Sequence, residues 1–133
     1  MSKQILFKVM LAATALFIAG YWITVFTGIF PVEELVPGYR TWFMSFPLAD
    51  SYIAVCAVLT VYYLAMNRKI AGLFGAMAGS GLLFLGLYAV SYGHVTGLLY
   101  KLTNDELIEI AIKIYCLTAG TYFILKSWKW INQ

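Results

Sequence analysis

The sequence predicts an all-α integral membrane protein: one domain, residues 1–133, folded as an antiparallel bundle of four transmembrane helices with both termini in the cytoplasm. Three observations predict it. Hydrophobic residues make up 62% of the chain and charged residues 11%, whereas an average soluble domain has about 25% charged residues. Four segments are apolar and long enough to cross a bilayer. Basic residues collect at one set of expected helix ends and acidic residues at the other.

The expected spans cover about residues 5–30, 47–66, 70–93 and 107–128. The third span has no charged residue, and its 24 residues would form a helix about 36 Å long. Gly72, Gly79 and Gly86 recur in it every seven residues, and small residues let membrane helices approach closely. We therefore expect this helix to be the central packing element of the bundle. The Gly72/Gly79/Gly86 face could also join copies of the chain in a homo-oligomer.

The first span resembles a secretory signal peptide at its start, because lysines precede an apolar stretch. The apolar run is longer than a signal peptide allows, so we expect the span to be retained. Ala13, Gly20 and Thr27 lie at helical spacing and form a stripe of small residues. This stripe is the predicted bundle-facing side of the first helix.

The longest connection, residues 31–46, contains aromatic residues that favour the headgroup layer. A short interfacial helix over residues 39–44 is therefore possible. Ser45 is the expected N-cap of the second span, and Thr103 or Asn104 that of the fourth.

Charge sorting predicts the orientation of the bundle. One set of helix ends carries most of the basic residues, namely Lys3, Lys8, Arg68, Lys69, Lys126 and Lys129. The other set carries Arg40, Lys101 and all six acidic residues, namely Glu33, Glu34, Asp50, Asp105, Glu106 and Glu109. Because basic residues favour the cytoplasmic side, we expect both termini in the cytoplasm, with the protein in a cell membrane or a bacterial inner membrane.

Polar side chains gather in the outer halves of the four spans. Six of them form the candidate ligand-binding site: Asp50, Tyr88, Tyr92, His94, Glu109 and Lys113. Asp50 lies about one turn inside the second span, where a carboxylate costs several kcal/mol unless it is paired or hydrated. Two alternatives follow for Asp50. Its carboxylate binds an ion, a proton or a substrate, or it lies at the depth of the lipid head groups and is stabilised by free helix N–H groups.

Glu109 and Lys113 have the i, i+4 spacing and the order that favour a salt bridge within a helix. They either neutralise each other at the mouth of the bundle, or Lys113 turns toward Asp50. The second arrangement would create a buried group of acids and a base that could bind a proton or an anionic group.

Tyr88 and Tyr92 lie one turn apart on the third span. They are either interfacial anchors and packed aromatic residues, or one wall of a ligand pocket. His94 is the only histidine. It either ends the third span without a further role or makes binding sensitive to pH.

We expect no metal site and no cofactor. A lone histidine excludes bis-histidine haem ligation, and the chain has no C-x-x-C, phosphate-loop, metalloprotease or nucleotide-binding motif. Cys56 and Cys116 are expected to be small buried residues, with a disulfide between them as the alternative. No basic run interleaved with aromatic residues occurs, so nucleic acid is not an expected partner.

Three functions remain open. The first is a small membrane protein, surrounded by lipid, whose outward-facing polar pocket binds or transports a small amphiphile, a lipid head group or an ion. The second is a non-catalytic accessory or structural subunit of a larger membrane complex. The third is a membrane enzyme acting on a lipid or isoprenoid, with Asp50, Glu109 or His94 as acid–base groups. The sequence favours a protein that is not an enzyme.

Overall fold

The computed structural model describes residues 2–133 and contains helices but no strand in that range. In chain order the elements are α1 (Ser2–Phe26), α2 (Tyr39–Phe43), α3 (Pro47–Ala65), α4 (Ile70–Thr96), the short 3-10 helix η1 (Leu98–Tyr100) and α5 (Asn104–Ile131). Four segments are long and apolar enough to span a membrane: Gln4–Phe26, Tyr39–Ala65, Ile70–Thr96 and Asn104–Ile131. The prediction of an all-helical chain with four potential membrane spans is confirmed.

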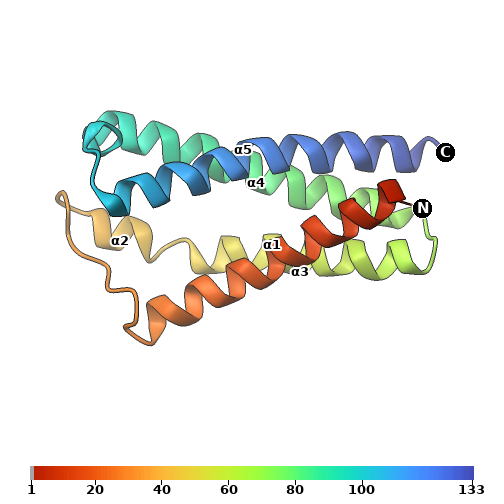
Figure 1. Ribbon diagram of the computed structural model, residues 1–133, viewed down its shortest axis with the longest axis horizontal. Coiled ribbons are helices and arrows are strands. Elements are labelled where there is room, and N and C mark those ends of the chain that lie inside the picture. Colours follow the sequence, from red (N-terminus) through yellow and green to blue (C-terminus); the bar gives the residue numbers. More distant parts are fainter. Residues whose placement is uncertain (1) are drawn as a thin grey trace.

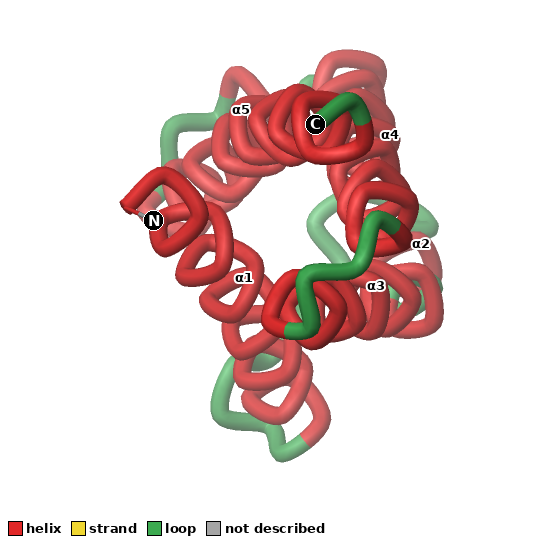
Figure 2. The backbone as a smooth tube through the Cα atoms, turned by 90° about the vertical axis from the view of Figure 1, so that its right-hand side faces the viewer, coloured by secondary structure: helices red, strands yellow, loops and turns green. Residues whose placement is uncertain are grey.

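The two termini lie at the same end of the long axis, and the α1–α2 and α4–α5 connections lie at the opposite end (Figure 1). We call these the terminal end and the loop end. α4 packs against both α3 and α5, which agrees with its predicted central position, whereas α1 packs mainly against α3 and barely contacts α5. α1 also diverges from α5 toward the loop end, as both views show (Figures 1 and 2).

Glycines bring α4 and α5 into close contact. A Cβ atom added to Gly79 would lie 2.6 Å from the carbonyl oxygen of Gly120, and one added to Gly120 would lie 2.7 Å from the carbonyl oxygen of Gly79. Gly72 and Gly86 also face α5. The glycine face is therefore covered within the chain. The homo-oligomer that the sequence suggested through this face would require α5 to move away.

The predicted bundle-facing side of α1 is wrong. Ala13, Gly20 and Thr27 are all exposed. The buried side instead carries mostly larger side chains, namely Phe7, Leu11, Thr14, Ala15, Trp22 and Val25. This helix packs through long side chains rather than through close backbone approach, since large residues make more dispersion contacts in the core.

Helix ends differ from the prediction by a few residues. α1 ends at Phe26, before the predicted end, because the chain turns at Gly28 with φ +80°, a conformation that glycine adopts readily. The short helix α2 lies within the range expected for an interfacial helix. At the other connection, the Thr103 hydroxyl accepts a hydrogen bond from the Glu106 N–H at 3.2 Å and caps α5 as predicted. The predicted cap at Ser45 is wrong, because its hydroxyl donates to the carbonyl of Thr41 instead.

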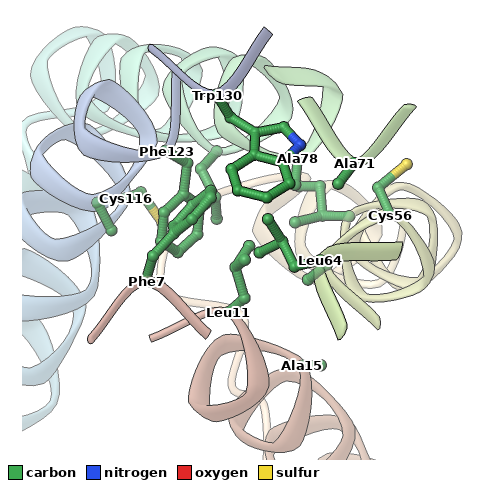
Figure 3. Packing of buried hydrophobic residues seen from close by; sticks show 14 residues of the cluster. Phe7, Leu11, Ala15, Cys56, Leu64, Ala71, Ala78, Cys116, Phe123 and Trp130 are labelled. Atoms are coloured by element: carbon green, nitrogen blue, oxygen red, sulfur yellow. The ribbon is translucent and has the colours of Figure 1, made fainter. Parts of the chain in front are cut away.

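Two clusters of buried apolar residues fill the bundle. The first, the terminal core, joins α1, α3, α4 and α5 and includes Phe7, Leu11 and Phe123, which are at most 3% exposed (Figure 3). Cys56 and Cys116 belong to this core and are both free thiols, as expected for small buried residues. The second, the loop-end cluster, consists of Trp22, Val25, Tyr39, Phe43 and Leu98.

The α3–α4 turn is fastened to the end of α5 by two side chains. The Lys69 ammonium donates to the carbonyl oxygens of Ile131 and Gln133 at 3.2 and 2.7 Å, and the Trp130 indole N–H donates to the carbonyl of Arg68 at 3.0 Å. These contacts place two basic residues beside the C-terminus. The Lys3 side chain, also predicted at this end, lies outside the described part of the chain.

Candidate functional site

A cavity of about 100 Å³ lies between the terminal core and the loop-end cluster. Its wall includes Leu82 and Cys116 from the terminal core and Trp22 and Phe43 from the loop-end cluster. All five α-helices or their immediate flanks contribute side chains, and most of the wall is apolar or aromatic. The polar exceptions are Thr14, Tyr21, Asp50, Glu109, Lys113 and Tyr115. The space suits a small polar group on an apolar body.

Asp50 is the most informative residue of this wall. It lies in the first turn of α3 and is only 8% exposed. Its Oδ2 accepts a hydrogen bond from the indole N–H of Trp22 at 2.7 Å, whereas the buried Oδ1 has no hydrogen-bond partner. The carboxyl is therefore held by an indole from α1 and not by free N–H groups of α3. A buried acceptor without a donor costs about 1–3 kcal/mol. Binding of a proton at Oδ1, or a hydrogen bond from a water or a ligand, would remove this cost.

Trp42 contributes a second unsatisfied group to the same wall. Its indole N–H is buried and has no acceptor. The Trp42 ring is held by stacking on Tyr92, with ring centroids 3.9 Å apart and planes 7° apart. Asp50 of α3 and Trp42 of α2 thus both line the cavity, and each has one buried polar atom without a partner, an acceptor on Asp50 and a donor on Trp42. A ligand that carries both a donor and an acceptor would complete both groups.

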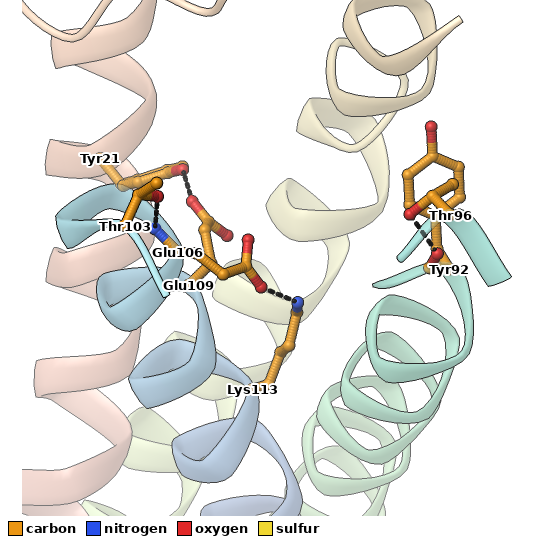
Figure 4. Close-up of polar contacts among 7 residues, drawn as sticks. All are labelled: Tyr21, Tyr92, Thr96, Thr103, Glu106, Glu109 and Lys113. Carbon is orange, nitrogen blue, oxygen red and sulfur yellow. Dashed lines mark hydrogen bonds and ion pairs between the residues drawn. The ribbon is translucent and has the colours of Figure 1, made fainter. Parts of the chain in front are cut away.

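The ionised groups of α5 pair differently from the prediction. Lys113 donates to Glu106 at 3.3 Å, with both side chains about nine-tenths buried. Glu109 instead accepts a hydrogen bond from the Tyr21 hydroxyl at 3.1 Å (Figure 4). The predicted Glu109–Lys113 salt bridge is therefore wrong, as is a contact from Lys113 to Asp50. Glu106 lies two turns from Lys113 on the same side of α5, and the two buried charges stabilise each other there.

Two side-chain hydrogen bonds hold α1 to α5, although the two helices share few other contacts. The Tyr21–Glu109 bond is one, and the Thr14–Tyr115 bond, 2.5 Å between hydroxyl oxygens, is the other. All four residues line the cavity. The bonds therefore enclose the cavity on the side where helix packing is weakest.

The structure brings together three of the six predicted site residues and separates the others. Asp50, Glu109 and Lys113 line the cavity, whereas Tyr88, Tyr92 and His94 do not. Tyr88 is 48% exposed, and Tyr92 lies behind the Trp42 ring, apart from the charged groups (Figure 4). Both tyrosines therefore fit the alternative of packed aromatic residues.

His94 is exposed, and its Nδ1 lies 2.6 Å from the Tyr100 hydroxyl at the loop end. Its imidazole therefore contacts η1 and does not line the cavity. Sequence reasoning missed Trp22 and Trp42, because an indole in a membrane span usually indicates an interfacial anchor.

A smaller pocket adjoins the cavity at the loop end. Glu109 and Phe43 line both spaces. The smaller pocket is otherwise bounded by the α1–α2 connection and by the first turn of α5, and it contains four acidic residues: Glu33, Asp105, Glu106 and Glu109. We call it the acidic antechamber. Within residues 2–133, no group of three or more His, Cys, Asp or Glu side chains could hold a metal ion.

Comparisons of the chain with protein-family models, with curated proteins and with solved structures find no match. A function for this chain therefore rests on its own residues and their geometry.

Proposed function

We propose that the chain is an antiparallel four-span membrane bundle with both termini in the cytoplasm and a cavity that faces the outside. The cavity binds or transports a small amphiphile, a lipid head group or an ion. One observation carries the proposal: Asp50 is buried in the wall of the cavity with one carboxyl oxygen lacking a partner. Natural membrane proteins place a carboxyl at such depth mostly for function, because its burial is costly.

The orientation rests on charge. The termini and the α3–α4 turn, which contains Arg68 and Lys69, lie at one end (Figure 1). The acidic antechamber is lined by residues of the α1–α2 connection and the start of α5, at the other end. By the positive-inside rule the terminal end faces the cytoplasm, either of a cell membrane or of a bacterial inner membrane. The cavity lies toward the opposite end and would then open to the outside.

Binding needs less of this fold than transport does. The terminal core closes the bundle below the cavity, with Leu11, Phe123 and Thr60 fully buried. Four helices around one axis normally fill their centre with side chains in this way. A transport path would require this core to rearrange, so binding from the outer side is the simpler activity.

Asp50→Asn is expected to abolish retention of the bound molecule while leaving the helix content unchanged. The amide keeps the shape of the side chain but removes its charge. Native mass spectrometry of the full chain, released from its own membrane in mild detergent, measures the retained mass directly, and circular dichroism measures the helix content.

Glu34→Gln is the matched control, since Glu34 is an exposed acid of the α1–α2 connection and lines neither the cavity nor the smaller pocket. It is expected to retain the same molecule as the unaltered chain. Equal retention by the Asp50 and Glu34 variants would contradict the proposal. Co-purification of a second protein, with no small molecule, would support the accessory-subunit alternative.

A further inference from the structure

We propose that the cavity binds an amphiphilic amine in its protonated form, with an ammonium N–H donating to Oδ1 of Asp50. This inference rests on the proposed function and names the class of ligand. The apolar part of the amine would lie against the aromatic wall of the cavity.

The first support is the balance of buried charge. Asp50, Glu106 and Glu109 place three carboxyl groups in or beside the cavity, and among the described side chains Lys113 is the one basic group of its wall. Lys113 is already paired with Glu106. An anionic head group would therefore meet carboxylates without a free cation, whereas a cationic group would offset an unpaired charge.

The second support is the direction of the missing hydrogen bond. Trp22 already occupies Oδ2 of Asp50, and the free Oδ1 requires a donor rather than an acceptor. A protonated primary amine has three N–H donors, and a hydrogen bond to a charged group contributes more than one between neutral groups. The free indole N–H of Trp42 could donate to an acceptor elsewhere on the same ligand, such as a hydroxyl near the amine.

The third support is the aromatic wall. Trp22, Trp42, Phe43 and Phe46 line the cavity together with Tyr21. The faces of such rings attract organic cations, most strongly where water is excluded. They also offer apolar surface to a hydrocarbon chain. A wall of this kind is a poor site for a hard inorganic cation, which requires about six oxygen ligands.

The fourth support is the charge beside the cavity at the loop end. The acidic antechamber shares Glu109 and Phe43 with the cavity. Clustered acids raise the local concentration of cations and repel anions. The acids beside the cavity therefore favour an ammonium over an anion at this end of the bundle.

Protons compete with the amine for Asp50, so binding should weaken as the pH falls. The other titratable side chains in the cavity wall come from α1 and α5: Tyr21, Glu109, Lys113, Tyr115 and Cys116. The lining residues of α2 and α4 carry no titratable group. Glu109 is also a carboxylic acid in this wall, so the Asp50 variant is needed to assign the pH effect.

Four probes with the same hydrocarbon chain test the inference: octylamine, trimethyloctylammonium, octanol and octanoate. Each is titrated into the full chain in uncharged detergent micelles, with tryptophan fluorescence as the readout, because Trp22 and Trp42 lie in the cavity wall. Empty micelles with free tryptophan provide the blank. We expect octylamine to bind about tenfold or more tighter than the other three, the ratio that one hydrogen bond to a charged group provides.

Asp50→Asn should remove that preference and its pH dependence, and Glu34→Gln should keep both. The ranking of the four probes on the unaltered chain tests the inference even if the Asp50 variant fails to fold. Equal binding of octylamine and trimethyloctylammonium would overturn the N–H contact. Preference for octanol or octanoate would overturn the amine but leave the proposed binding function standing. Signals that match the blank for all four probes would contradict the binding function itself.

Discussion

Gly79→Val is expected to lower the free energy of unfolding by about 3 kcal/mol or more, at the upper end of the cost of overpacking a core. The reason is the contact between α4 and α5. A Cβ at this position would lie 2.6 Å from the carbonyl oxygen of Gly120, and the nearby Ile124 and Phe123 side chains leave no free space. Backbone cannot move aside as a flexible side chain can, so the two helices must separate.

The measurement is thermal unfolding in detergent micelles, followed by circular dichroism. Gly20→Val is the matched control, because Gly20 lies within α1 and a Cβ added there meets no atom within 4 Å. Glycine-to-valine effects on helix propensity are then common to both variants. Similar unfolding temperatures for the two variants would show that α4 and α5 do not approach each other as described.

Lys113→Met is expected to cost about 3–5 kcal/mol, the usual result of removing one partner from a buried ion pair. Glu106 would then remain as a carboxyl that is 7% exposed, with no basic partner at 3.3 Å. Methionine keeps much of the length of the lysine side chain, so the lost packing is small. Unfolding by denaturant in micelles measures the change.

Two further variants isolate the charge effect. Glu106→Gln combined with Lys113→Met should recover much of the loss, because the uncompensated charge is absent from the double variant. Lys101→Met should have little effect, since Lys101 is exposed in the loop before α5. A double variant no more stable than Lys113→Met alone would indicate that the pair is not coupled.

The four spans could be predicted because they depend on local properties. A run of apolar residues long enough to cross a bilayer needs no knowledge of its neighbours, and the structure places α4 within three residues of its predicted end. The seven-residue spacing of glycines in α4 also identified the closest packing in the bundle. Gly79 contacts Gly120, one of the small residues of α5.

The side of α1 that faces the bundle could not be predicted in the same way. This helix carries apolar residues on every side. The sequence alone therefore does not distinguish a side that faces lipid from a side that faces the other helices. The small residues predicted one side of α1 as the buried side, but the side that is buried carries Phe7, Leu11 and Trp22. Because the wrong side of α1 was predicted to face the bundle, the contact between Trp22 and Asp50 could not be predicted.

Candidate site residues could be predicted where a charged side chain lies within an apolar span, because its position along the span is enough to identify it. Asp50, Glu109 and Lys113 are charged groups in apolar spans, and all three line the cavity. Their partners depend on contacts between distant parts of the chain. Tyr21 and Glu109 are 88 residues apart, and no spacing rule within one helix anticipates that bond.

Labelling with dicyclohexylcarbodiimide tests the place of Asp50 most directly. This apolar reagent modifies protonated carboxyl groups in water-poor surroundings, and peptide mass spectrometry locates the adduct. In membranes that contain the full chain, at a pH low enough to protonate Asp50, the adduct should form on Asp50 in preference to the exposed Glu33, Glu34 and Asp105, and octylamine should suppress it. An Asp50 that stays unlabelled at every pH tested, or an Asp50 adduct that octylamine leaves unchanged, would contradict a buried carboxyl that binds an amine.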